Sequence, residues 1–323
     1  MELTIGKRRR LQQCSTPDGL FVVMALDHRD SLRRALNPVN PESIGYSEMV
    51  AFKLDVVSAL APVSTAVLLD PEFSAAQSIT GGVLPGRAGL LVAVEAAGQA
   101  DEPLAHRPEV LEGWGVEKSA RMGASAVKLR LPCQPEGRHA TAQERLLDSV
   151  VAECRAHDIP LFLRLLPLAA GSRARKLSSA EKRAAVIETA RRLTSRGIEV
   201  LATEFPLDTT EVPDEAAWAA SCAELDEASQ TPWVLLSGGV GFEAFARQTQ
   251  IACGAGASGI VAGRTVWGEA AELRGEAALD FLNKTAVDRL VELGDIVAEY
   301  GAPWTQRYPA SAHDVGESWY ESY

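Results

Sequence analysis

Short apolar runs alternate with amphipathic stretches along nearly the whole chain. The first run, residues 21–26, has no polar position, as expected of a strand that is buried on both faces. Seven later runs stop just as abruptly at polar or small residues. They cover residues 65–69, 89–94, 124–131, 160–166, 198–205, 235–240 and 260–264. The pattern therefore predicts eight strands.

Between these runs, apolar residues recur at the spacing of an amphipathic helix. The predicted helices cover residues 43–60, 110–122, 142–157, 179–195, 214–229, 242–253 and 277–300. Ser178 and Glu181 form a capping pattern at the start of one of them. The basic run Lys7–Arg10 is short, and we expect it to form a solvated turn.

Strands that alternate with helices imply parallel pairing and right-handed crossovers. A closed barrel leaves no edge strand, whereas an open doubly wound sheet is the alternative. No GxGxxG follows the first strand, which disfavours a dinucleotide-binding sheet. The composition shows no internal break. We predict a single (β/α)8 barrel domain over residues 1–323, with a short N-terminal lead-in and a C-terminal tail.

The composition and net charge of the chain indicate which classes of binding partner are excluded. The chain has 323 residues, is 46% hydrophobic and carries a net charge of −11, which argues against nucleic acids and anionic membranes. It has no membrane-spanning run and no apolar signal core, and its five cysteines lack CxxC spacing. We therefore predict a cytoplasmic protein. The aromatic tail, residues 304–323, could pack across the barrel or join a subunit contact, which leaves a homo-oligomer open.

The last two strand ends offer a phosphate site. One carries Ser237, Gly238 and Gly239, and the other carries Gly263 and Arg264. Glycine lets the backbone approach an anion closely, and arginine supplies a cationic fork. The late strands of such barrels are where a phosphate is usually bound. Two ordinary tight turns and a surface arginine are the alternative.

Polar residues mark most of the other strand ends, where barrel enzymes carry their chemistry. They are Asp27, His28, Asp70, Glu72, Glu95, Lys128, Arg130, Arg164 and Glu204. Burying Lys128 unpaired would be costly, so we expect it beside Asp27 or Glu204, as a proton-transfer group, an electrostatic clamp or a purely structural ion pair. For Asp70 and Glu72, helix-capping roles are favoured over catalysis. Glu95 is undecided.

Together these segments resemble the class I tagatose-1,6-bisphosphate aldolases and the related sulfofructose-phosphate aldolases. The matching segments are residues 7–8, 25–29, 68–73, 89–95, 126–128, 236–240 and 262–267, in the same order over almost the whole chain. The resemblance implies a (β/α)8 barrel that binds phosphorylated ketoses of the dihydroxyacetone-phosphate type. It places the phosphate at Ser237, Gly239, Gly263 and Arg264, and it makes Asp27 and Lys128 polar active-site positions.

Three positions depart from that family pattern. Ala202 stands where the family carries its Schiff-base lysine, and a methyl group cannot form an imine. Arg164 stands where the family has a proton-shuttling glutamate, and arginine does not exchange protons near neutral pH. His28 replaces the usual glutamine.

Several functions fit these departures. We expect a carbon–carbon lyase acting on a sugar phosphate by a non-standard mechanism, with Asp27, His28, Lys128, Arg164 and Glu204 as catalytic residues. An enolising isomerase and a non-catalytic sugar-phosphate sensor are the alternatives. The residues Arg130, Arg164 and Arg264 favour a more anionic ligand, with a second phosphate, a sulfonate or a carboxylate.

The sequence lacks a paired-histidine ligand motif, so we predict neither a metal nor another cofactor. A metal-assisted lyase is the weaker alternative. Its candidate ligands would be Asp27, His28, Asp70, Glu95 and His139.

Overall fold

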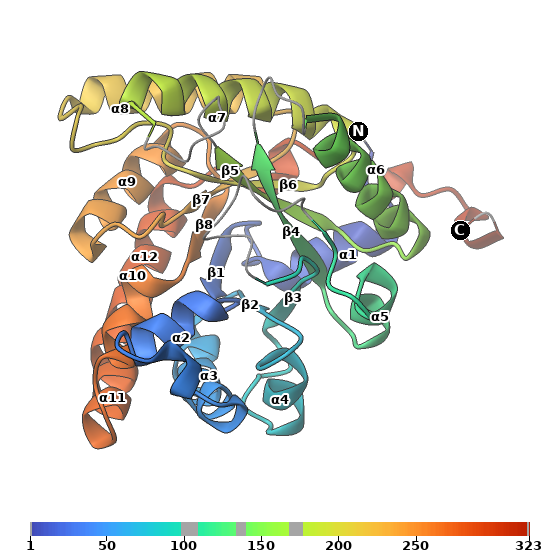
Figure 1. The fold of residues 1–323 in the computed structure, drawn as a ribbon. Helices are drawn as coiled ribbons and strands as arrows, with labels where there is room; N and C mark the ends of the chain where they lie inside the picture. Colours follow the sequence, from blue (N-terminus) through green and yellow to red (C-terminus); the bar gives the residue numbers. More distant parts are fainter. Residues whose placement is uncertain (1, 98–108, 134–139, 168–176, 322) are drawn as a thin grey trace.

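A closed parallel barrel forms the centre of the computed structural model, which describes residues 2–97, 109–133, 140–167, 177–321 and 323 (Figure 1). Neighbouring strands pair in chain order, and β8 closes the ring against β1. The strands are β1 (Phe21–Ala25), β2 (Ala66–Leu69), β3 (Gly89–Ala93), β4 (Ala126–Cys133), β5 (Leu161–Pro167), β6 (Val200–Glu204), β7 (Trp233–Leu236) and β8 (Gly259–Ala262). The barrel confirms the predicted fold.

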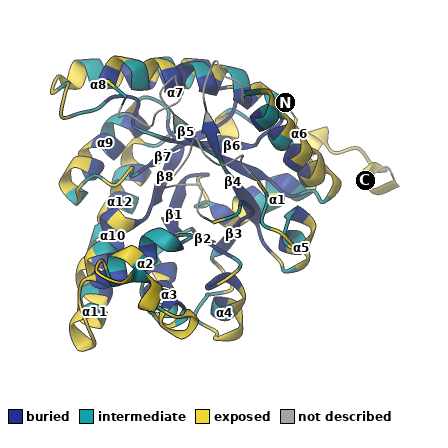
Figure 2. Ribbon diagram, viewed as in Figure 1, coloured by how far each residue is buried: buried dark blue, intermediate teal, exposed yellow. Residues whose placement is uncertain are grey.

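Alternate side chains of each strand point to opposite sides of the barrel wall. In β1, Val23 and Ala25 belong to the cluster inside the barrel, whereas Val22 and Met24 pack outward against the helices. Figure 2 shows the result, a buried barrel inside a layer of helices with exposed outer faces. Both faces of the strands are therefore apolar, which explains their continuous apolar runs.

Helices cover the outside of the barrel between successive strands (Figure 1). The α-helices are α1 (Ile5–Cys14), α2 (Asp30–Leu36), α3 (Tyr46–Leu60), α4 (Ala75–Thr80), α5 (Val116–Arg121), α6 (Ala140–Ala156), α7 (Ser179–Leu193), α8 (Glu215–Ala228), α9 (Phe242–Gly254), α10 (Arg264–Trp267), α11 (Glu276–Phe281) and α12 (Val287–Tyr300). The predicted capping box is present, since Ser178 caps α7 and Glu181 bonds back to it.

The predicted helix over residues 110–122 is wrong in its first half. Val110 forms an isolated antiparallel bridge with Glu95, and α5 begins only at Val116, after Gly115. The predicted last helix, residues 277–300, is interrupted by a π-helical turn, η5 (Leu282–Ala286). Apolar spacing alone does not reveal either feature, because a bridge or a π turn keeps the same residues buried.

The expected solvated turn at Lys7–Arg10 is also wrong, because these residues lie in α1. Lys7 is buried, and its Nζ lies 2.6 Å from Oε1 of the buried Glu199. Trp304 and Tyr308 belong to the cluster inside the barrel, and the Tyr308 hydroxyl donates to the Glu199 carbonyl at 2.9 Å. The start of the tail therefore packs across the barrel end that carries α1.

No helix within the described ranges is long and apolar enough to cross a membrane. Four cysteines, Cys14, Cys154, Cys222 and Cys253, are buried free thiols.

Candidate active site

One cavity of about 570 Å³ opens among the carboxyl ends of the strands. Its lining includes ten of the predicted site residues, namely Asp27, His28, Lys128, Arg164, Glu204, Ser237, Gly238, Gly239, Gly263 and Arg264. Parallel strands of a closed barrel all end on the same side, so residues far apart in sequence converge there. The cavity is therefore the candidate active site.

Lys128 lies at the centre of the polar network in this cavity. It points inward from β4 and its Nζ lies 2.7 Å from Oδ2 of Asp27. A second short contact joins it to Oε1 of Glu95, whose Oε2 accepts the backbone N–H of Arg130 at 3.2 Å. All three charged side chains are almost completely buried. Of the two expected partners, Asp27 is present, whereas Glu95 takes the place of Glu204.

The charge on Lys128 sets the protonation of both carboxylates. Burial alone would raise the pKa of Asp27, but Lys128, His28 and Arg164 lower it well below its usual range. Glu95 behaves in the same way, because Lys128 and Arg130 outweigh its burial and lower its pKa. Both side chains are therefore acceptors that are already ionised at neutral pH.

His28 is a neutral imidazole at neutral pH. Burial lowers the pKa of His28 to about 3, with Asp27 opposing and Arg264 and Arg164 reinforcing the shift. Its ring packs edge-on against Trp267 at 5.3 Å between centroids, and its Nδ1 is 4.0 Å from Asp27. It contributes a polar ring without a charge.

Glu204 lies closer to the predicted phosphate turns than to Lys128. Its carboxylate pairs with Lys182 of α7, with Oε2 and Nζ 3.3 Å apart. A Cβ placed on Gly238 would lie 3.4 Å from Cδ of Glu204. Sequence reasoning missed Lys182, because this residue reaches Glu204 from a helix rather than from a strand end.

The two predicted phosphate turns meet in the cavity. Gly238 and Gly239 have φ values of +59° and +83°, a region that favours glycine and turns the backbone after β7. A Cβ on Gly239 would lie 3.9 Å from the Arg264 guanidinium, so the second turn adjoins the first. The Thr265 hydroxyl donates to the Val240 carbonyl at 2.7 Å and ties the two turns together. The geometry suits an anion bound between backbone N–H groups and an arginine.

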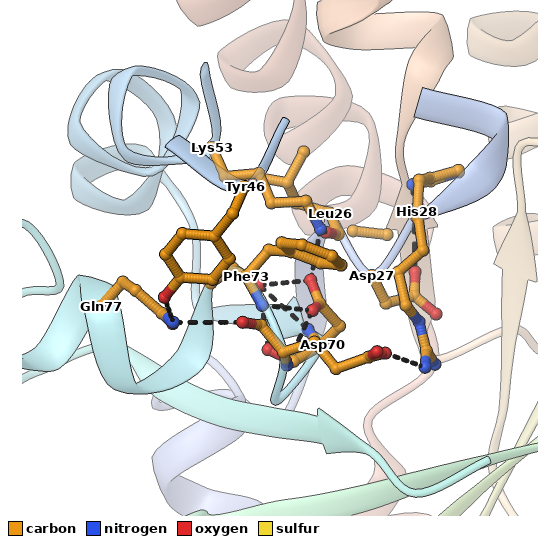
Figure 3. A network of polar contacts seen from close by, with 12 residues as sticks. Leu26, Asp27, His28, Tyr46, Lys53, Asp70, Phe73 and Gln77 are labelled. Atoms are coloured by element: carbon orange, nitrogen blue, oxygen red, sulfur yellow. Dashed lines mark hydrogen bonds and ion pairs between the residues drawn. The ribbon is translucent and has the colours of Figure 1, made fainter. Parts of the chain in front are cut away.

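A second buried ion pair lies at the ends of β1 and β2 and connects them (Figure 3). Lys53 of α3 pairs with Asp70, and both side chains are fully buried. Lys53 also donates to the Leu26 carbonyl at 2.9 Å, one residue before Asp27. Asp70 Oδ1 accepts the backbone N–H of Phe73 at 2.7 Å. The pair is a support for the strand end that carries Asp27 and His28.

This network only partly fits the predicted capping roles. Asp70 does accept backbone N–H groups of the following turn, but the cap residue of α4 is Ser74. Glu72 instead pairs with Arg29 at 2.5 Å. Arg29 also donates to the Glu95 carbonyl at 2.8 Å. The strand ends of β1, β2 and β3 are therefore linked through the buried side chains of Lys53, Asp70 and Arg29.

Within the described part of the chain, no group of three or more His, Cys, Asp or Glu side chains is placed to hold a metal ion. His139, one of the candidate ligands, lies outside the described residues.

Comparison with known proteins gives a consistent family. Residues 21–269 match the family model described as DeoC/LacD family aldolase. The tagatose 1,6-diphosphate aldolase of Streptococcus agalactiae serotype V is 29% identical over 332 residues, covering 95% of this chain and 100% of the relative. The tagatose 1,6-diphosphate aldolase of Lactococcus lactis is 29% identical over 330 residues, with the same coverage.

Solved structures of aldolases share the fold. An archaeal fructose 1,6-bisphosphate aldolase has a TM-score of 0.58 at 18% identity, covering 88% of this chain and 99% of that one. A fructose-bisphosphate aldolase from Slackia heliotrinireducens has a TM-score of 0.61 at 15% identity, covering 96% and 94%. At this identity the likeness concerns the barrel alone.

Proposed function

Because this chain belongs to the DeoC/LacD family of aldolases, we propose that it is a carbon–carbon lyase for a phosphorylated ketose or related sugar phosphate. The observation that carries the proposal is the joint lining of one cavity by the phosphate turns and by Lys128 with its carboxylates. A substrate phosphate binds Gly239 and Arg264, and the carbon skeleton extends toward Lys128.

The reaction runs without an imine. Ala202 lines the cavity and has no amine, and the resemblance to the family gives its position to the Schiff-base lysine. Lys128 is engaged as a donor to two carboxylates, whereas an imine requires a free amine as nucleophile. Lys128 therefore acts as an electrostatic stabiliser of a developing enolate oxygen.

Glu204 supplies the proton transfer. Its carboxylate takes the proton from the hydroxyl of the carbon that leaves as an aldehyde. The carbon–carbon bond breaks, and its electron pair moves into the ketone to give an enolate held by Lys128. The protonated Glu204 then returns the proton to the enolate carbon. His28 and Arg164 bind and orient the substrate, because neither exchanges protons at neutral pH.

Borohydride treatment in the presence of dihydroxyacetone phosphate, followed by peptide mass mapping, tests the mechanism. We expect neither inactivation nor a reduced adduct. An adduct on Lys128 would restore a Schiff base at a new position and overturn the proposal.

The variant Lys128→Met tests the role of the ammonium group. We expect loss of turnover with binding of dihydroxyacetone phosphate largely intact, because the phosphate turns lie on other strands. Full turnover in this variant would remove Lys128 from the reaction.

A non-catalytic sugar-phosphate sensor is the second candidate, and Ala202 is the observation that favours it. Tight binding of ketose phosphates with no turnover by the unmodified protein would support the sensor. The variant Ala202→Lys separates the cases further, because gain of aldol cleavage would show that the surrounding site still suits imine chemistry.

A further inference from the structure

Two arginines stand side by side in the cavity wall. Arg130 of β4 is opposite Arg164 of β5 in the strand register, and Arg164 is opposite Ala202 of β6. All three residues line the cavity. They form one row across three strands, in which Arg164 has Arg130 on one side and Ala202 on the other.

Part of each guanidinium lacks a partner among the described residues. The Nε atoms of Arg130 and Arg164 are buried and have no hydrogen-bond partner in the described part of the chain. No carboxylate of the described chain forms an ion pair with either group. Other cations at the site differ, since Lys128 pairs with Asp27 at 2.7 Å and Lys182 pairs with Glu204 at 3.3 Å. The row therefore presents to the cavity two guanidinium groups that form no ion pair with a described carboxylate, which makes it a place for an external anion.

The charge around the cavity agrees with this interpretation. Its described lining carries six Lys or Arg and four Asp or Glu side chains, a net charge of +2 in a chain of −11. His28 adds no charge, because burial lowers its pKa to about 3. A cationic cleft in an acidic protein attracts anions. Of these cations, Arg264 belongs to the phosphate turns, and Arg130 and Arg164 are the two that adjoin each other on β4 and β5.

We propose that Arg130 and Arg164 bind a carboxylate at the end of the substrate opposite its phosphate, so that the substrate is a phosphorylated sugar acid. The inference rests on the proposed function, which assigns the phosphate to the turns after β7 and β8. In the closed barrel, β4 and β5 lie across from β8 and β1, so a ligand that contacts both sites spans the cavity.

The chemistry of the row favours a carboxylate over a second phosphate. Guanidinium forks match the two coplanar oxygens of a carboxylate. A phosphate presents a third oxygen, and the neighbouring Ala202 methyl offers it no hydrogen bond. The residues that depart from the family pattern, Arg164 and Ala202, are thereby explained together as one binding feature.

Calorimetric binding with matched ligands tests the proposal. The ligands are 6-phosphogluconate and glucitol 6-phosphate, which differ only in carboxylate against CH2OH, and the corresponding five-carbon pair, 5-phosphoribonate and ribitol 5-phosphate. We expect the acid to bind about tenfold or more tightly than the alcohol in at least one pair. Equal affinities in both pairs would overturn the proposal.

Variants locate the effect. Arg164→Gln and Arg130→Gln should each remove most of the preference for the acid, measured as the ratio of the dissociation constants of acid and alcohol. Arg264→Gln is the matched control, because it should weaken acid and alcohol equally and leave their ratio unchanged. If the ratio of the affinities for acid and alcohol is unchanged in both Arg164→Gln and Arg130→Gln, these two arginines do not bind the carboxylate.

Glucitol 1,6-bisphosphate distinguishes the two kinds of anion. We expect glucitol 1,6-bisphosphate to bind more weakly than 6-phosphogluconate. Tighter binding would mean that Arg130 and Arg164 bind a second phosphate, which would overturn the proposal of a carboxylate site. The outcome is independent of catalysis. If Arg164→Gln removes the preference but no substrate is cleaved, the carboxylate site stands and the lyase proposal fails.

Discussion

Lys128 shows how the surroundings of a single residue decide its chemistry. A lysine inside an apolar barrel could serve as a nucleophile if it were held neutral by burial. Here Asp27 and Glu95 both contact it, and its charge lowers the pKa of each of them. The same contacts also fit a purely structural ion pair at Lys128. For this reason turnover and ligand binding are measured separately in the variant Lys128→Met.

Arg264 gives a direct prediction at the residue scale. Arg264→Ala removes a charge-assisted contact to the phosphate, worth ~1.5–3 kcal/mol, which corresponds to roughly tenfold to more than a hundredfold in affinity. Calorimetry with dihydroxyacetone phosphate measures the loss. Arg247→Ala, a change at an exposed arginine of α9, is the control and should leave affinity unchanged. Unchanged binding in Arg264→Ala would reject the phosphate assignment.

The lowered pKa of His28 makes stability depend on pH. Below about pH 6.5 the unfolded chain binds a proton at this imidazole, whereas the folded protein resists protonation until about pH 3. Stability is therefore lost as the pH falls through this window. Between pH 6.5 and 4.5 this one group removes about 2 kcal/mol of unfolding free energy.

The variant His28→Asn has no such group and should lose correspondingly less stability over the same pH range. Urea unfolding of both proteins at pH 6.5 and 4.5 measures the difference. Parallel losses in the two proteins would show that His28 is not kept neutral by the fold.

At the scale of elements, buried charges fix the relative positions of the strand ends. Lys53 brings α3 onto the end of β1 through the Leu26 carbonyl, and Asp70 holds the turn after β2 through the Phe73 N–H (Figure 3). Arg29 adds a link to the Glu95 carbonyl after β3. The carboxylates that contact Lys128 come from two of these strand ends, so the links position both of them.

Removing one partner of the Lys53–Asp70 pair should strongly destabilise the folded protein. Lys53→Met leaves Asp70 buried without its counter-charge, and we expect a loss of ~3–5 kcal/mol in unfolding free energy. The double variant Lys53→Met with Asp70→Asn should recover part of the lost unfolding free energy, since the asparagine carbonyl oxygen can still accept the Phe73 N–H. Urea unfolding compares the three proteins. A double variant less stable than Lys53→Met would contradict this account.

At the scale of the whole molecule, the two ends of the barrel have separate tasks. The carboxyl ends of the strands line the polar cavity, whereas α1 and the aromatic residues Trp304 and Tyr308 pack across the other end. Lys7 and Glu199 form a buried pair there, outside the cavity lining. In this kind of barrel, chemistry is expected at the first end and stability at the second.

A change at the closed end should therefore affect stability without affecting binding. Lys7→Met leaves Glu199 unpaired, and we expect a loss of ~3–5 kcal/mol. The dissociation constant for dihydroxyacetone phosphate at a temperature where the variant stays folded should change less than twofold. Thermal unfolding and calorimetry test the two statements. A large loss of affinity would mean that the two ends are coupled.

The sequence determined the barrel and most of its site. Continuous apolar runs identify strands that are buried on both faces, and the polar residue after each run falls at the carboxyl end of a strand. The first predicted strand, residues 21–26, extends one residue beyond β1, which ends at Ala25. Ten of the predicted site residues line one cavity, because ring closure brings every strand end to the same place, whereas Asp70 and Glu72 lie outside its lining.

The tertiary structure alone decided which charges pair. Glu95, not Glu204, joins Asp27 at Lys128, and Lys182 reaches Glu204 from a helix. Lys7, in a basic run that resembles a solvated turn, is buried against Glu199. Local sequence cannot reveal such partners, since an ion pair depends on the distance between side chains that are tens to hundreds of residues apart. The pattern of apolar residues fixes which side chains face inward, and only the closed barrel fixes which of them meet.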